Sequence, residues 1–310
     1  MTKKIIIVAP KTISKNSPYR FDYSFWNFYL PLKNLGYDVE FCDTSVEGDV
    51  ELSNRISSLS PDLLFCIMTG DKNYCPNEPW KTLQEVKTSR GIKTFNWFCD
   101  DTWRFDQFSS KVCHIFDVCS TTRKDSLEEY RKIGYNKVFL TNWHANDNLY
   151  GSPTTNKQVD ITFIGGLHGQ RKSYIDYLEK NGLSINNPKN CSFEEMLWEY
   201  GRSKICLNFA RCSVGNKNQM KARLFEVVAS NSLLMTQKSP NIEDYFLEDK
   251  EAVFFSNPKE LYEKLSFLLK KPEILNKISN AGYNRYTKEH TSEKRLSKVI
   301  ETINNMVHHD

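Results

Sequence analysis

The chain has 310 residues, which at roughly 150 residues per domain predicts two domains. It carries 42 basic and 38 acidic residues, and a formal net charge of +4 is too small to indicate a polybasic partner. A local basic cleft for phosphate groups or nucleic acid is still compatible with it. Because 39% of the residues are hydrophobic and 26% are charged, the composition excludes a disordered chain.

No apolar run approaches the roughly 20 residues that a membrane-spanning helix needs. The nine cysteines are scattered without C-x-x-C spacing, and their odd number indicates reduced thiols. We therefore expect a cytoplasmic protein with no integral membrane segment and no metal. The alternative is a zinc site whose four ligands all lie in or beside strand-like runs: Cys99, Cys113, His114 and Cys119.

Short β-branched runs alternate with amphipathic stretches in the first half of the chain. Continuous apolar runs are typical of strands in a parallel sheet, and apolar residues at helical spacing predict the segments between them. The predicted strands cover residues 4–9, 37–43, 62–68, 93–98, 115–120 and 137–141, and the predicted helices cover 23–35, 50–58, 80–89 and 123–133. This alternation predicts a doubly wound parallel sheet.

The pattern lapses at residues 146–159, where Gly, Ser, Pro, Thr and Asn mark a linker, and then resumes. The later strands are predicted at 160–164, 204–209, 233–236 and 252–255, and the helices at 172–180, 193–203, 220–230, 258–269 and within 272–306. We predict Rossmann-like domains over 1–150 and 151–310, with a terminal helix that can pack back on the first domain. Two such halves form a cleft at the carboxyl ends of their strands.

A glycine turn follows the first predicted strand of the second half. Gly165 and Gly166 allow a ligand to approach the backbone, and the following helix offers its N-terminus to a phosphate. Arg171 stands at this helix start, where a cation is unfavourable unless an anion is present. The alternative is an ordinary turn, followed by two neighbouring basic residues that are solvated. Neither G-x-G-x-x-G nor a P-loop occurs, which disfavours a dinucleotide oxidoreductase.

A second informative segment is a basic loop that runs into an apolar helix. Lys217, Lys221 and Arg223 place three cations within seven residues. Glu226 lies three residues beyond Arg223, so both can lie on one helix face. A solvated ion pair with Arg223 is the alternative. However, a carboxylate among apolar neighbours needs partners, and sugar hydroxyls would supply them.

Several motifs together resemble one family. ITFIGGLHGQR, KARLFEVVASNSLLMT and the long stretch from AVFFSNPKELYEKL onward resemble the second domain of GT-B glycosyltransferases of group 1, in particular the CgeB-like proteins. NWFCDDTWRFDQF and NWHANDNLY resemble segments of their first domain. The resemblance implies an α/β GT-B fold with two Rossmann-like doubly wound domains facing a central cleft. It also implies metal-independent, retaining transfer of a sugar from a nucleoside diphosphate sugar to a hydroxyl acceptor.

The resemblance assigns roles by position. Glu226 matches the acidic residue that binds the donor ribose, and the basic residues match groups that face the diphosphate above the glycine turn. Asn218 replaces the first acidic residue of the E-x7-E pattern, so the sugar contacts differ there. The implied co-substrate is UDP- or GDP-linked, with no cofactor. The implied donor-binding residues are Gly165, Gly166, Arg171, Lys217, Asn218, Lys221, Arg223 and Glu226.

Three residues are catalytic candidates. Asp100 and Asp101 follow a predicted strand at the cleft edge, where a carboxylate can act as a base on the acceptor hydroxyl or orient it. The alternative is that they cap the next helix. His168, in the glycine turn, is the best placed of the histidines.

The acceptor side is predicted from three further residues. Arg20 lies in the loop after the first strand, and Trp97 and Trp103 flank the acidic pair as possible platforms for a sugar ring. The acceptor itself, whether a glycan, a protein, a small molecule or modified DNA, is left open. Two alternatives remain: an enzyme that glycosylates a hydroxymethylated DNA base, and a catalytically silent protein that binds nucleotide sugars.

Overall fold

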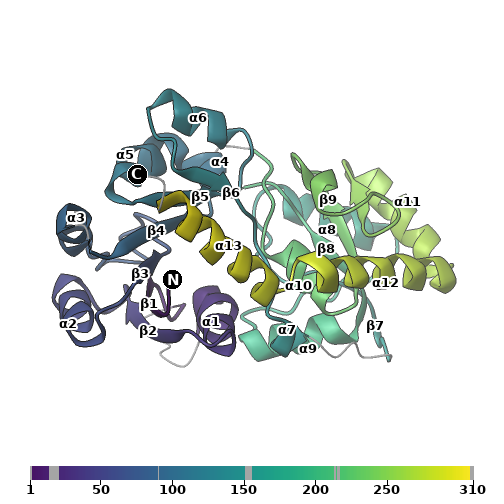
Figure 1. Ribbon diagram of the computed structural model, residues 1–310. Coiled ribbons are helices and arrows are strands. Elements are labelled where there is room, and N and C mark those ends of the chain that lie inside the picture. Colours follow the sequence, from purple (N-terminus) through teal and green to yellow (C-terminus); the bar gives the residue numbers. More distant parts are fainter. Residues whose placement is uncertain are drawn as a thin grey trace. The chain divides into compact units, whose positions relative to one another are not determined.

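The computed structural model describes residues 2–13, 21–89, 91–150, 156–212, 214 and 217–307 (Figure 1). Its chain divides into two compact units. Unit 1 comprises Met1–Asn142 together with Ser292–Asp310, and unit 2 comprises Trp143–Thr291. The chain therefore leaves unit 1 before the predicted linker and returns to it for the last helix.

Parallel strands build the sheet of unit 1. Within the described ranges it has six strands in the order β2-β1-β3-β4-β5-β6, and every neighbouring pair is parallel. The strands are β1 (Lys4–Ala9), β2 (Asp38–Asp43), β3 (Leu63–Cys66), β4 (Lys93–Phe98), β5 (Val118–Thr121) and β6 (Val138–Leu140). Each overlaps a predicted run, because strands buried on both faces are rich in apolar residues. The fifth strand begins three residues later than predicted, because Cys113–Ile115 form a short 3₁₀ turn.

Helical segments connect these strands. They are η1 (Phe25–Tyr29), α1 (Leu30–Asn34), α2 (Asp49–Leu59), α3 (Trp80–Ser89), α4 (Asp101–Arg104), η2 (Phe105–Ser109), α5 (Ser110–Val112), η3 (Cys113–Ile115), α6 (Ser126–Lys132) and α13 (Ser292–Val307). The predicted helix at 23–35 forms, but it begins as the π-helical segment η1. A π-helical segment also follows α4, in a region for which the sequence predicted no helix.

The last helix completes the core of unit 1. Figure 1 shows α13, in yellow, running along the strands of this unit. Its buried residues Leu296, Val299 and Ile303 belong to the same apolar cluster as Phe28 and Phe95. Helix α13 has one apolar face, and this cluster buries it.

Unit 2 has a smaller parallel sheet. Among its described residues the strand order is β10-β9-β8-β7. The strands are β7 (Val159–Thr162), β8 (Ser203–Asn208), β9 (Leu233–Gln237) and β10 (Val253–Phe255). The helical segments are α7 (Asp147–Tyr150), α8 (Gln170–Lys180), α9 (Phe193–Arg202), α10 (Arg223–Ala229), η4 (Ile242–Asp244), α11 (Pro258–Leu269) and α12 (Pro272–Glu289).

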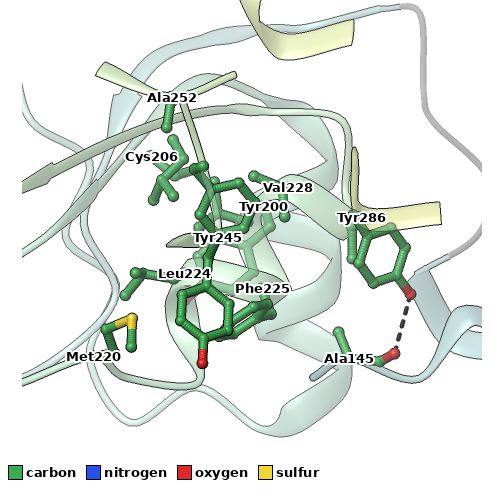
Figure 2. Close-up of a cluster of buried hydrophobic side chains, with 14 of the residues drawn as sticks. Ala145, Tyr200, Cys206, Met220, Leu224, Phe225, Val228, Tyr245, Ala252 and Tyr286 are labelled. Carbon is green, nitrogen blue, oxygen red and sulfur yellow. Dashed lines mark hydrogen bonds between the residues drawn. The ribbon is translucent and has the colours of Figure 1, made fainter. Parts of the chain in front are cut away.

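Both faces of the unit 2 sheet are covered. Ile205 and Leu207 of β8 belong to one apolar cluster and Cys206 to the other, as the alternation of side chains in a strand requires. Figure 2 shows the cluster around α10, in which the Tyr286 hydroxyl donates a hydrogen bond to the Ala145 carbonyl at 3.1 Å. Each unit is thus a Rossmann-like α/β layer structure. Over the described residues, no helix combines the length and apolarity needed to cross a membrane.

Candidate functional site

A pocket of about 380 Å³ opens at the carboxyl ends of β7, β8 and β9 in unit 2. Ligands of parallel α/β sheets bind at this end of the strands, so the pocket is the candidate functional site. Its walls come from the loop after β7, the residues after β8 and the end of β9. The lining residues are His168, Gly169, Gln170, Arg171, Phe209, Arg211, Cys212 and Gln237.

The glycine turn is shaped by close contacts with side chains. Gly165 has a φ of +145°, and a Cβ there would lie 3.1 Å from a guanidinium nitrogen of Arg223. A Cβ on Gly166 would lie 2.2 Å from Nε2 of His168. The Asn187 side-chain amide donates to the Phe163 carbonyl at 2.6 Å and to the Gly165 carbonyl at 3.2 Å. Glycine is therefore needed at both positions for this arrangement of His168 and Arg223.

Two arginines converge on this turn. The guanidinium carbons of Arg171 and Arg223 lie 6.0 and 5.3 Å from the centre of the Phe163 ring. Arg171 donates a hydrogen bond to the Gly166 carbonyl at 3.0 Å. Burial and the positive charge of Arg223 lower the pKa of Arg171. The two cations thus lie within electrostatic range of each other in one site.

Arg223 is held in place by neutral partners. Its Nε donates to the Tyr200 hydroxyl at 3.2 Å, and its Nη1 donates to Oδ1 of the buried Asn208 at 3.4 Å. In the part of the chain that the structure describes, no carboxylate forms an ion pair with Arg171 or Arg223. Two neighbouring guanidinium groups that are fixed without a carboxylate in ion-pair contact favour an anionic ligand, and guanidinium geometry suits phosphate.

The remaining basic candidates have different surroundings. Lys221 donates hydrogen bonds to the carbonyls of Phe209 and Arg211, at 3.0 and 2.9 Å, and so ties the loop after β8 to the start of α10. Asn218 donates to a main-chain carbonyl just after β9 at 2.7 Å. Lys217 is exposed. Arg171 and Arg223 are therefore the cations that the structure brings together at the glycine turn.

Glu226 lies in α10 and is only 7% exposed. Burial raises the pKa of Glu226 to about 7, against the opposing effects of the Arg223 charge and a hydrogen bond with Tyr150. A hydroxyl group that donates to this carboxylate would favour its charged form. Glu226 thus changes its charge near neutral pH.

The acidic pair of unit 1 divides between two environments. Asp100 precedes α4 and forms an ion pair with Arg104, with 3.7 Å between Oδ2 and Nε. Its side chain does not cap the helix. Asp101 is 1% exposed and accepts a hydrogen bond from the Tyr130 hydroxyl at 3.0 Å. Burial raises the pKa of Asp101 to about 6. Asp101 thus belongs to the interior of unit 1, and Asp100 is the more accessible of the two.

The predicted acceptor-side residues also differ. Trp97 is completely buried in unit 1, edge-on to Phe28 at 4.8 Å, so its ring has no free face for a sugar and the predicted platform is wrong for this residue. Trp103 is partly exposed, with the guanidinium carbon of Arg104 4.2 Å from its ring centre. Arg20 lies outside the described residues.

The chain is similar to known proteins both in part of its sequence and in its fold. Residues 149–301 match the family model described as glycosyl transferase-like. A glycosyltransferase from Rickettsia africae is 11% identical over all of both chains, with a TM-score of 0.66. The chain has the GT-B fold, and its second half is similar to the glycosyl transferase-like family. HepE from Anabaena, solved in complex with UDP and glucose, is 10% identical over 98% of this chain and all of its own chain, with a TM-score of 0.64.

The DNA-modifying enzyme β-glucosyltransferase is also similar to this chain. It is 14% identical over 97% of this chain and 99% of its own, with a TM-score of 0.62. At such identities the likeness concerns the fold alone, so it does not favour DNA over other acceptors. No curated protein sequence matches this chain.

The sequence did not point to several residues of the pocket in unit 2. Arg211 and Gln237 stand at the ends of predicted strands, which is a usable signal because those ends meet at the pocket. Asn208 is a polar residue in a strand that is otherwise mostly apolar, and it stands at the end of that strand, where the same signal applies. Among the described residues, no three His, Cys, Asp or Glu side chains gather in a way that could hold a metal ion.

Proposed function

We propose that this protein is a glycosyltransferase that uses a nucleoside diphosphate sugar, with UDP or GDP as the nucleotide, and transfers the sugar to a hydroxyl group. The convergence of Arg171 and Arg223 on the glycine turn, without an ion-pairing carboxylate, carries this proposal. A diphosphate supplies the missing negative charge. HepE, whose structure contains UDP and glucose, has the same fold and supports the choice of ligand class.

The proposed reaction follows from where charge develops. As the bond between the anomeric carbon and the diphosphate oxygen breaks, the bonding electrons remain on the diphosphate, and fixed guanidinium groups stabilise that charge without a metal. The acceptor oxygen bonds to the anomeric carbon and passes its proton to the departing diphosphate oxygen. We propose His168 of the pocket as the group beside the reacting sugar, and Asp100 as the candidate that contacts the acceptor.

Three further details complete the proposal. Transfer retains the anomeric configuration, and the chain is CgeB-like, as the sequence motifs imply. All nine cysteines are free thiols, which supports a cytoplasmic location. The acceptor is a hydroxyl compound of unassigned class.

A thermal-shift panel tests the ligand class. UDP, GDP, ADP and CMP are each added to the protein with and without EDTA, and we expect one nucleoside diphosphate to raise the melting temperature in both conditions. At 100 times its Kd a ligand adds roughly 2.7 kcal/mol of stability. If no nucleotide stabilises the protein, the proposal fails. The alternative of a catalytically silent protein that binds nucleotide sugars then fails as well. Loss of the shift in EDTA would contradict metal independence, and NMR of the product anomer tests retention.

Glu226 should make donor binding depend on pH. The charged carboxylate accepts hydrogen bonds from ribose hydroxyls more strongly than the neutral acid does, and with a pKa of about 7 it is largely protonated at pH 6. We expect the Kd for the nucleotide to rise by up to about tenfold per pH unit below pH 7 and to level off above it. Isothermal titration from pH 5.5 to 8.5 measures this dependence.

Two variants serve as comparison for the pH series. Glu226→Gln should bind more weakly and lose the dependence around pH 7. Glu263→Gln removes an exposed carboxylate of α11 and should retain it. A flat wild-type profile would mean that Glu226 does not bind the ribose.

A further inference from the structure

Unit 2 contains a second pocket, of about 500 Å³, away from the glycine turn. Ser230 lines this pocket at the C-terminal end of α10, whereas Arg223 begins the helix at the donor pocket. At 1.5 Å per residue, the two ends of α10 are about 10 Å apart. The lining residues are Leu149, Tyr150, Asn156, Gln158, Glu194, Leu197, Trp198, Gly201, Arg202 and Ser230.

One face of α9 forms the main wall. Glu194, Trp198 and Arg202 are four residues apart and therefore lie on the same side of the helix. The helix begins with a reciprocal cap, in which the Ser192 hydroxyl accepts from the Glu195 amide at 3.1 Å and the Glu195 side chain accepts from the Ser192 amide at 2.6 Å. This wall is thus a well-defined helical surface.

Trp198 is 60% exposed, and its indole is nevertheless fixed. The guanidinium carbon of Arg202 lies 4.1 Å from the ring centre. Arg202 in turn donates two hydrogen bonds to the carboxylate of the buried Glu199, at 3.1 and 2.9 Å, and Asn186 donates to the same carboxylate at 2.6 Å. An aromatic surface that is ordered before binding loses little entropy when it takes a ligand.

Two further lining residues supply polar groups. Asn156 and Gln158 are exposed, and the main-chain amide of Gln158 donates to the Arg202 carbonyl at 2.8 Å. Between them, the Lys157 ammonium donates to the carbonyls of Gly201 and Ser230, at 2.8 and 3.1 Å. The main chain that carries these two side-chain amides is therefore anchored to the end of α9 and to the residue after α10.

The charge of the lining narrows the choice of ligand. Arg202 is already paired with Glu199, and Glu194 adds a carboxylate, so no cation among the described lining residues is available for a phosphate or a carboxylate ligand. Trp198 is also the one large apolar side chain on α9 that is mostly exposed in the described structure. A single residue is too small a patch for a stable protein interface, which buries about 800 Å² per partner.

We propose that this pocket binds a neutral sugar unit of a glycan chain, stacked on the Trp198 indole and hydrogen-bonded through its hydroxyls to Asn156, Gln158 and Glu194. Pyranose rings present a C–H face and a rim of hydroxyls, which match an aromatic surface and amide or carboxylate groups respectively. The volume lies within the usual range for small-molecule pockets. The inference goes beyond the donor assignment and does not require it.

Titration with neutral tetrasaccharides tests the proposal. Maltotetraose, cellotetraose and chitotetraose are added to the full chain, and tryptophan fluorescence and its quenching by iodide are followed. We expect at least one tetrasaccharide to bind and to protect Trp198 from iodide. Trp198→Ala should weaken this binding at least tenfold. Phe267→Ala, which removes a 52% exposed ring from α11, should leave it unchanged.

Other outcomes overturn the proposal. They are the absence of binding by all three sugars, binding that survives Trp198→Ala, and protection of Trp198 that depends on protein concentration and not on sugar. The nucleotide-induced thermal shift is measured on the same variants and should be unaffected by Trp198→Ala. Failure of the glycan site is therefore distinguishable from failure of the donor site, and retention of the melting temperature shows that each variant folds.

Discussion

Arg223→Gln should lower kcat/KM for the nucleotide sugar by roughly 10²- to 10³-fold, the usual effect of removing one fixed donor of charge stabilisation. The substitution removes the cation that Tyr200 and Asn208 hold beneath the glycine turn. It also leaves Arg171 without its neighbouring positive charge. The loss should appear mainly in kcat, because the diphosphate gains its extra charge as the sugar leaves.

Lys172→Gln provides the matched control. It removes one positive charge from the adjacent α8, where Lys172 is exposed and paired with Asp176 at 2.6 Å. Steady-state rates with a nucleotide sugar should be unchanged in this variant. If Arg223→Gln keeps its melting temperature and loses less than about threefold in kcat/KM, Arg223 does not stabilise the leaving group.

Gly282→Ala should lower the free energy of unfolding by about 2 kcal/mol, because overpacking costs typically 1–3 kcal/mol. A Cβ at Gly282 would lie 2.4 Å from the carbonyl oxygen of Glu251, and main chain cannot rotate aside as a side chain can. Alanine is the better helix former by about 1 kcal/mol, which offsets only part of the clash. Helix α12 must therefore move away from the segment before β10.

Calorimetry can separate the steric clash from the gain in helix propensity. Asn284→Ala makes an exposed change two residues further along α12 and should leave the melting temperature equal or slightly higher, since propensity improves without a clash. Gly282→Ala should melt several degrees lower. An unchanged melting temperature for Gly282→Ala would show that α12 and the Glu251 carbonyl can separate at little cost.

The strands were predictable for a simple physical reason. A parallel strand covered on both faces is mostly apolar, as the Ile/Val run of β1 and the aromatic residues of β4 show, so both could be placed with their observed bounds. The same property hides which face a residue occupies. The strand pattern around Trp97 is the same whichever face of the sheet its side chain occupies. The sequence alone therefore could not show that its indole packs on Phe28 inside unit 1.

The segment Asp101–Ile115 shows a second limit. Short α, π and 3₁₀ turns follow one another there, and none is long enough to produce a helical period in the apolar residues.

The donor pocket was only partly predictable. Its glycines and Arg223 stand in motifs, whereas Asn187 and Asn208 act through strands and loops that only the fold brings together.

The return of the chain to unit 1 sets an order of events during synthesis. Helix α13 leaves the ribosome after all of unit 2, although its residues Leu296 and Ile303 share an apolar cluster with Phe28 of η1 and Phe95 of the sheet in unit 1. An N-terminal unit that would otherwise fold first must therefore keep part of its apolar surface uncovered until unit 2 has been synthesised. Nascent chains that stall before α13 are then the ones most exposed to aggregation and to capture by chaperones.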